Sequence, residues 1–171
     1  MARINVPEGE GHEIERVWRL NPELGNAVIG LRYAIYNNNH LPLRIREGIR
    51  YIIADCNKCP ICLSARQLDE GKTGLSEHFY KLVLEDRYSP EFDERERLAF
   101  EYTHRFCYDH FSISDELMER LRAAFTDVEL FDLCVTVARH LGFGRFTQVL
   151  QLDLACDIHV SPSDLAGAPT D

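Results

Sequence analysis

The sequence predicts an all-α protein. Its apolar residues recur mostly every three to four positions, the period at which side chains share one face of a helix. Side chains typical of helix starts precede several of these apolar stretches. The β-branched stretch at 134–137 is compatible with a strand, but the helix cap before it and the longer apolar period favour a helix.

Two helices are expected between residues 21 and 55. The first has Asn21 as its N-cap and Pro22 at its first helical position, which proline favours. Its expected buried face is a stripe of apolar residues: Leu24, Val28, Leu31 and Ile35. Residues 37–42, with three asparagines and a proline, separate it from the second helix, which runs to about Asp55. The apolar stripe of the second helix consists of Ile45, Ile49, Ile52 and Ile53.

Two shorter helices are expected next. The third begins near Cys59 and ends at Gly71, because glycine is common just past a helix end. Its apolar positions are Ile61, Ala65 and Leu68. The fourth ends before Ser89 and Pro90, and its apolar positions are Leu75, Phe79 and Leu82.

Three further helices each begin with a capping side chain. Asp93 with Glu96 and Thr126 with Glu129 form capping boxes for the fifth and seventh helices, and Ser114 opens the sixth. Their apolar stripes are Ala99, Tyr102 and Phe106; Leu117, Leu121 and Ala124; and Phe131, Cys134, Val135, Ala138 and Leu141. Glycines at 142 and 144 are expected to kink or end the seventh helix before residues 146–149.

Length and composition indicate one domain, over residues 1–160, followed by a flexible tail at 161–171 that is rich in Ser, Pro and Ala. The chain has 171 residues, 19 basic against 28 acidic, and a net charge of −9 without a basic cluster. This charge argues against nucleic acid or an anionic membrane as a main partner. Six cysteines and no apolar leader favour a reducing compartment, and we expect the cytoplasm.

The chemistry concentrates in the sequence C-x-x-C-x-x-C, formed by Cys56, Cys59 and Cys62. A ferredoxin-like iron–sulfur run requires a further cysteine where Arg66 stands. A structural zinc site usually combines two close pairs of ligands, and no second C-x-x-C follows. A redox dithiol formed by Cys59 and Cys62 at a helix start fits better. We therefore expect no metal and no cofactor other than a redox-active disulfide.

Neighbouring charges suggest how such a dithiol is tuned. Cys62 and Arg66 are four residues apart, so on a helix they share a face, where the guanidinium would favour the Cys62 thiolate. If the chain reverses near residues 57–58, Glu47 comes opposite, and Glu47, Arg66 and a thiol form one hydrogen-bonded cluster. Glu47 and Arg66 could equally be surface charges. Cys56 could be a core residue or a third exchanging thiol.

Cys107 and Cys134, which fall on apolar stripes, are expected to be small buried residues.

Glu47 and the dithiol together carry a family resemblance. The sequence EGIRYIIADCNKCPIC has the spacing E-x(11)-C-x-x-C, which resembles the carboxymuconolactone decarboxylase and AhpD-like alkylhydroperoxidase superfamily. The stretch ERERLAFEYTHRF and residues 114–150 are similar to the C-terminal helices of that family. The resemblance covers residues 20–155.

The resemblance implies an AhpD-like helical bundle, with the CxxC at the N-terminus of a helix, assembled as a trimer or hexamer of identical chains. It implies that Cys59 and Cys62 cycle between dithiol and disulfide, in the reduction of peroxides or exchange with disulfides. A reducing dithiol or a partner redox protein would then restore them. Glu47 corresponds to the proton-relaying glutamate of the family, whereas the relaying histidine is replaced by Arg66.

The replacement at Arg66 affects peroxide reduction more than disulfide exchange, because arginine does not release a proton at neutral pH. We favour Cys62 as the attacking thiolate, and the reverse assignment stays open. The branch of the family that decarboxylates lactones lacks the dithiol, which makes that reaction less expected. The alternatives are a non-catalytic helical oligomer with an inert or regulatory dithiol, and a metal-binding cysteine site.

Overall fold

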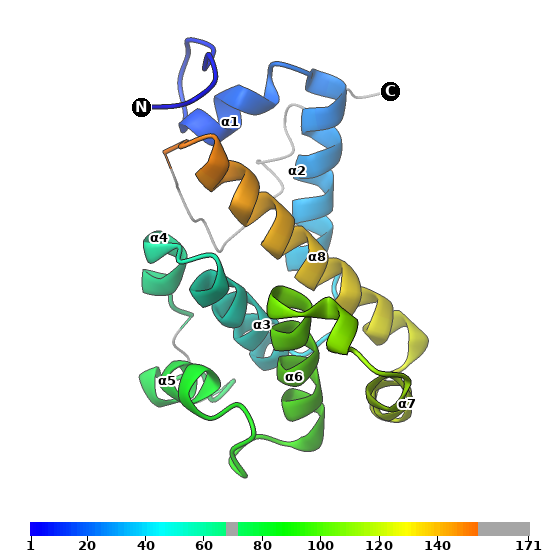
Figure 1. The fold of residues 1–171 in the computed structure, drawn as a ribbon. Coiled ribbons are helices and arrows are strands. Elements are labelled where there is room, and N and C mark those ends of the chain that lie inside the picture. Colours follow the sequence, from blue (N-terminus) through cyan, green and yellow to red (C-terminus); the bar gives the residue numbers. More distant parts are fainter. Residues whose placement is uncertain (68–71, 154–171) are drawn as a thin grey trace. The chain divides into compact units, whose positions relative to one another are not determined.

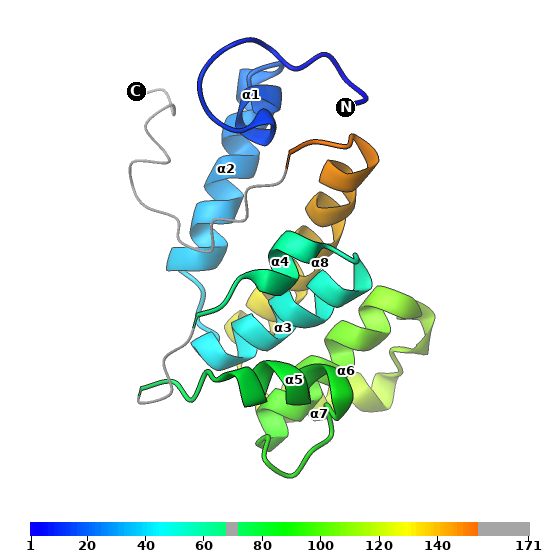
Figure 2. The ribbon, with the colours of Figure 1, turned by 90° about the vertical axis from the view of Figure 1, so that its left-hand side faces the viewer.

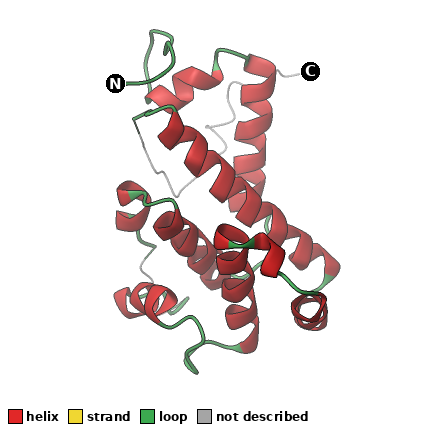
Figure 3. Cartoon of the chain, in the orientation of Figure 1, coloured by secondary structure: helices red, strands yellow, loops and turns green. Residues whose placement is uncertain are grey.

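The computed structural model describes residues 1–67 and 72–153. Within these ranges every regular element is a helix and no β-strand occurs, so the all-α prediction is confirmed (Figure 3). None of these helices combines the length and apolar character needed to cross a bilayer. The tail expected at 161–171 and the expected helix end at Gly71 lie outside the described residues.

The chain forms two compact units. Among the described residues, the first comprises 1–39 together with 145–153, and the second comprises residues 40–144. The interpretation of residues 1–160 as one domain stays a prediction.

The first unit contains α1 (Glu13–Trp18), α2 (Pro22–Asn37) and the end of α8 (Asp127–Val149) (Figure 1). α1 packs on α2, and the ring of Trp18 stacks on Phe146 with 5.1 Å between centroids. α1 was not predicted, because its six residues give only a weak periodic signal.

The apolar stripe expected on α2 is only partly buried. Ile35 is buried, but Leu24 and Leu31 expose 62% and 36% of their surface. Ile35 is thus confirmed as buried, whereas the expected burial of Leu24 and Leu31 is wrong.

The second unit is built around α3. Its elements are α3 (Leu43–Cys56), α4 (Pro60–Ser64), α5 (Glu77–Glu85), α6 (Glu94–Tyr108), the 3₁₀ turn η1 (His110–Ser112), α7 (Asp115–Ala124) and α8 as far as residue 144. α3 packs against α5 and α6 (Figures 1 and 2). Residues 45 and 47–54 are all buried, so α3 is enclosed around nearly its whole circumference.

Gly48 lets α3 approach α6 closely. A Cβ at this position would collide with the ring of Phe100, which is itself fully buried. The rings of Phe100 and Phe92 pack edge to face with 5.2 Å between centroids. This dense core fixes the helix that carries Glu47 and ends at Cys56.

The predicted helix starts are confirmed. Four side chains accept a backbone N–H three residues further on: Asn21, Asp93, Ser114 and Thr126. Glu96 and Glu129 complete the two capping boxes by accepting the N–H of the capping residue. Ser76 caps α5 in the same way, a helix start that was not predicted.

α8 does not end at its glycines. The helix continues through Gly142 and Gly144 to Val149, so the expected end at these glycines is wrong. Gly144 is instead a point of close approach, because a Cβ there would collide with the side chain of Asn57. Asn57 is buried, and its amide donates to the carbonyl of Leu141 at 3.4 Å.

α4 is much shorter than predicted. It ends at Ser64, and Ala65 is extended (φ −68°, ψ 130°). Cys62 and Arg66 therefore do not share a helix face, and the corresponding expectation is wrong. The reason lies in contacts made by two arginines, described below, which take over the last carbonyls of this helix.

Candidate dithiol site

The dithiol stands where the chain reverses between α3 and α4. Lys58 adopts the left-handed region (φ 50°), and the N–H of Cys59 donates to the carbonyl of Ala54 at 3.0 Å. This turn lays α4 beside α3 (Figure 2). The chain reversal expected near residues 57–58 is confirmed, and so is a CxxC at the N-terminus of a helix.

The two sulfur atoms face each other at the start of α4. Cys59 and Cys62 are thiols with 2.6 Å between their Sγ atoms, and a disulfide bond spans about 2.05 Å. Cys59 is the N-cap of α4, and its sulfur accepts the N–H of Cys62 at 3.3 Å. Cys59 is 4% exposed, whereas Cys62 is half-buried, so the outer thiol is Cys62.

Glu47 lies behind the dithiol, buried in α3 with 2% exposure. Arg50 donates to both carboxylate oxygens, from Nε to Oε1 and from Nη2 to Oε2, each at 2.9 Å. The hydroxyl of Tyr80 donates to Oε2 at 2.8 Å, and the amide of Gln67 donates to Oε1 at 3.2 Å. Both oxygens of the carboxylate are thus engaged by fixed donors.

Tyr80 links Glu47 to the segment after α4. Its hydroxyl oxygen accepts the N–H of Gln67 at 3.0 Å while its proton goes to Glu47. Burial raises the pKa of Tyr80 to about 12, with the Gln67 N–H acting against this rise and the Glu47 carboxylate adding to it. The phenol is therefore neutral at physiological pH and acts as a donor to the carboxylate.

Arg50 also reaches the end of α4. Its Nη1 donates to the carbonyl of Cys62 at 2.7 Å, and its Nη2 donates to the carbonyl of Ala65 at 3.0 Å. One buried guanidinium therefore joins the Glu47 carboxylate to the main chain of the dithiol segment.

Arg66 binds the same end of α4 from outside. It donates to the carbonyls of Leu63 and Ala65, and to the hydroxyl of Tyr51 at 3.0 Å. Its guanidinium carbon stands 4.8 Å from the ring centroid of Tyr51 and 4.6 Å from that of Tyr80, which is cation–π geometry. Arg66 thus caps the helix instead of facing a thiol.

The expected cluster of Glu47, Arg66 and a thiol is only partly present. Among the described residues Glu47 bonds to Arg50, Tyr80 and Gln67. It is linked to Arg66 indirectly, through Tyr80 and through the Ala65 carbonyl that Arg50 and Arg66 share.

Three residues of this site were missed from the sequence: Arg50, Gln67 and Tyr80. A signal existed for Arg50, since it stands three residues after Glu47 among the isoleucines of α3, where an isolated charge needs a partner.

The remaining described cysteines lie apart from this pair. Cys107 is buried, as expected, and Cys134 is half-buried and accepts the hydroxyl of Tyr102 at 3.2 Å. Cys56 is half-buried, and its thiol donates to the carbonyl of Cys107 at 3.9 Å. Across residues 1–67 and 72–153, no three Cys, His, Asp or Glu side chains are grouped so that they could hold a metal ion.

The sequence matches no family model and no curated protein at a significant level. Solved structures do resemble it. An uncharacterized peroxidase-related protein from Silicibacter sp. TM1040 has a TM-score of 0.70 at 17% identity, covering 89% of this chain and 91% of that one. A protein from Agrobacterium tumefaciens, described as a putative antioxidant defence protein AhpD, has a TM-score of 0.66 at 22% identity, covering 92% and 100%.

The chain has the AhpD-like fold.

The same AhpD-like fold also occurs in the debrominase Bmp8, which matches with a TM-score of 0.66 at 14% identity, covering 91% of this chain and 82% of that one. At these identities the likeness concerns the fold. Since proteins described as antioxidant and as a debrominase share it, the AhpD-like fold does not by itself select a substrate.

Proposed function

We propose that this AhpD-like protein is a thiol oxidoreductase that cycles Cys59 and Cys62 between a dithiol and a disulfide. The observation that carries the proposal is the pair of sulfur atoms 2.6 Å apart, one buried and one half-buried. A nucleophile that an oxidant can reach and a second thiol in contact with it are the two parts that a dithiol cycle requires.

We assign the attack to Cys62. In the peroxide reaction its thiolate attacks one peroxide oxygen, the O–O bond breaks, Cys62 becomes a sulfenic acid and an alkoxide leaves. The thiol of Cys59, which donates to the Cys62 sulfur, supplies the proton to that alkoxide. The Cys59 thiolate then attacks the Cys62 sulfur and displaces hydroxide, which becomes water with the proton that Cys62 released when it ionised. The disulfide, the alcohol and water are the products.

The reverse assignment, with Cys59 as the attacker, is disfavoured by exposure. Cys59 stands at the start of the helix, but its exposed fraction is only 4%. Cys59 fits the resolving role, because the Cys62 sulfur that it must attack lies beside its own sulfur.

Disulfide exchange uses the same two thiols. It needs no proton donor for the leaving group, because a thiolate leaves instead of an alkoxide. The Cys62 thiolate attacks an external disulfide, one thiolate leaves, and Cys59 resolves the mixed disulfide with loss of the second thiolate. A reducing dithiol or a partner redox protein returns the internal disulfide to the dithiol by the same two steps in reverse.

Glu47 and Arg66 take supporting roles in this proposal. Glu47 has its oxygens engaged by Arg50, Tyr80 and Gln67, which favours a counter-ion over a proton relay. Arg66 holds the end of α4 through the carbonyls of Leu63 and Ala65.

The assembly and the compartment are also proposals. We propose a homo-oligomer, for which the family resemblance implies a trimer or hexamer. The exposed leucines at 24 and 31 of α2 offer apolar surface that subunit contacts could cover. A chain with six cysteines, two of them forming the proposed redox dithiol, fits the reducing environment of the cytoplasm.

A turnover assay tests the activity. Wild type, Cys59→Ser and Cys62→Ser are supplied with a small dithiol as electron donor and either an organic peroxide or a small disulfide. We expect turnover by wild type and a loss of at least about a hundredfold in each variant, since neither retains the pair. Equal rates in all three proteins would contradict the dithiol cycle. Equal rates no higher than the rate without protein would favour a non-catalytic oligomer.

A further inference from the structure

Arg50 is a buried charge in the middle of the apolar face of α3, with 4% exposure. Its partner Glu47, one turn earlier, is 2% exposed. Two buried charges in a fold are costly to desolvate, and a bidentate pair offsets that cost only with good geometry and additional hydrogen bonds. The additional bonds of this pair lead to the dithiol segment.

α4 needs such support because it has five residues. A helix this short is not stable by itself, and the last carbonyls of any helix lack partners within it. Arg50 donates to the carbonyl of Cys62 at 2.7 Å and to that of Ala65 at 3.0 Å. These bonds fasten the main chain of Cys62 to α3.

The planar guanidinium suits this task. Nε and Nη2 take the two oxygens of Glu47, while Nη1 and Nη2 also reach the two carbonyls. A lysine ammonium offers three donors from one point and cannot meet four acceptors arranged in this way.

We propose that Arg50 is a positioning residue for the dithiol: by holding the Cys62 carbonyl it keeps the Cys62 sulfur against the Cys59 sulfur. This role rests on the proposed dithiol function. A pair of thiols held together has a high effective concentration, which favours the disulfide over two separate thiols. Loss of the Arg50 bonds frees the end of α4 and makes the internal disulfide harder to form.

The test is the equilibrium between protein dithiol and glutathione disulfide. Protein is equilibrated in glutathione buffers and quenched by alkylation, and the linkage between Cys59 and Cys62 is quantified by mass spectrometry. Removing Arg50 alone would leave Glu47 buried without its cation, so the main variant is Glu47→Met/Arg50→Met, which removes both charges together.

We expect the equilibrium constant for disulfide formation to fall about tenfold in the double variant, a shift of about 30 mV to a less negative reduction potential. Circular dichroism should show wild-type helix content. Arg50→Lys retains the positive charge beside Glu47 but lacks the planar donors of the guanidinium, and it should also lower the equilibrium constant for disulfide formation. If the double variant does not fold, Arg50→Lys is the variant that tests the role of Arg50.

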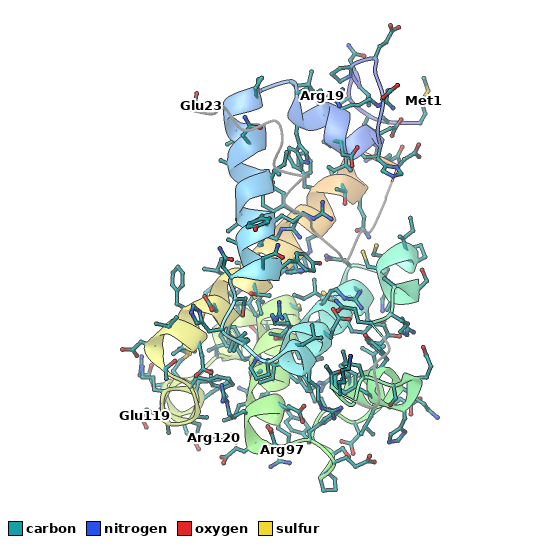
Figure 4. The ribbon with its side chains drawn as sticks, turned by 180° about the vertical axis from the view of Figure 1, so that it is seen from behind. Met1, Arg19, Glu23, Arg97, Glu119 and Arg120 are labelled. Atoms are coloured by element: carbon teal, nitrogen blue, oxygen red, sulfur yellow. The ribbon has the colours of Figure 1, made fainter. Side chains whose placement is uncertain are left out.

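Arg120→Met is the matched control. Arg120 lies on α7, far from α4 (Figure 4), and its side chain is 50% exposed in a 3.8 Å ion pair with Glu101. The equilibrium constant for disulfide formation in Arg120→Met should equal that of wild type. A folded double variant or an Arg50→Lys protein with the wild-type constant would overturn the role of Arg50. A wild-type dithiol that stays reduced in every glutathione buffer would overturn the proposed function itself.

Discussion

Glu47 and Arg50 form a buried bidentate ion pair one helical turn apart on α3, with both N–O distances at 2.9 Å. The glutamate that the sequence places upstream of the dithiol is therefore bound to a cation of its own helix. That cation, in turn, holds the carbonyl of Cys62. Glu47 is thus connected to the dithiol indirectly, through the Arg50 side chain and the main-chain carbonyl of Cys62.

The first prediction concerns the stability of this pair. Arg50→Met should lower the free energy of unfolding by about 3–5 kcal/mol, because it leaves the Glu47 carboxylate buried without a cation. Glu47→Met/Arg50→Met should cost much less, within about 2 kcal/mol of wild type, because no unpaired charge remains. Urea unfolding followed by circular dichroism measures both. Equal losses in the single and double variants would contradict a buried ion pair.

The second prediction concerns pH. Tyr80 has its pKa raised to about 12 by burial, while an unfolded tyrosine titrates near 10. Its contribution to stability is therefore complete below about pH 10 and is lost as the pH rises through about 12. Tyr80→Phe removes a donor to Glu47 and should cost about 1–2 kcal/mol near neutral pH.

The gap between wild type and Tyr80→Phe should shrink from pH 10 to 12 in urea unfolding experiments. A gap that stays constant over this range would show that Tyr80 does not titrate as the burial requires.

Helix starts could be predicted from the sequence because their causes are local. Each capping side chain accepts an N–H only three residues further on, so the cap and its partner lie within one short stretch of sequence. The capping residues are Asn21, Asp93, Ser114 and Thr126. The chain reversal after Cys56 and the pairing of Cys59 with Cys62 are local in the same sense.

The end of α4 could not be predicted, because it depends on tertiary contacts of two arginine side chains that the apolar periodicity does not register. The carbonyl of Cys62 is taken by Arg50, twelve residues earlier, and that of Leu63 by Arg66, whose guanidinium lies between two tyrosines. The spacing of apolar residues predicted a helix that continues past Ser64, and the contact of Cys62 with Arg66 was inferred from that longer helix.

Glycine could not be interpreted correctly from its helix propensity alone. Gly144 was expected to break α8, but it marks the approach of Asn57, which only the packing of the second unit reveals.

The third prediction tests close packing between α3 and α6. Gly48→Ala places a methyl group against the buried ring of Phe100 and should cost about 1–3 kcal/mol. Gly142→Ala is the matched control, since nothing lies within 4 Å of its Cβ position, and it should stabilise α8 by about 0.5–1 kcal/mol. Thermal and urea unfolding compare the two, and a harmless Gly48→Ala would contradict the packing.

The fourth prediction concerns the position where the family resemblance implies a histidine. Arg66 caps Leu63 and Ala65 rather than facing a thiol, so Arg66→His should lower peroxide reduction and disulfide exchange by similar factors. The two activities are measured on one preparation with the same electron donor. A selective rise in peroxide reduction would mean that proton delivery limits the enzyme and that the Cys59 thiol does not supply it.

The central claim, a dithiol cycle begun by Cys62 and closed by Cys59, is tested most directly by a single-turnover reaction. Reduced protein is mixed with one equivalent of organic peroxide, and its products are identified by mass spectrometry with a sulfenic acid trap present. Wild type should form the Cys59–Cys62 disulfide, and Cys59→Ser should stop at a trapped sulfenic acid on Cys62. Cys62→Ser should react with the peroxide much more slowly than wild type does. A sulfenic acid on Cys59 in Cys62→Ser, or no reaction in wild type, would contradict the account.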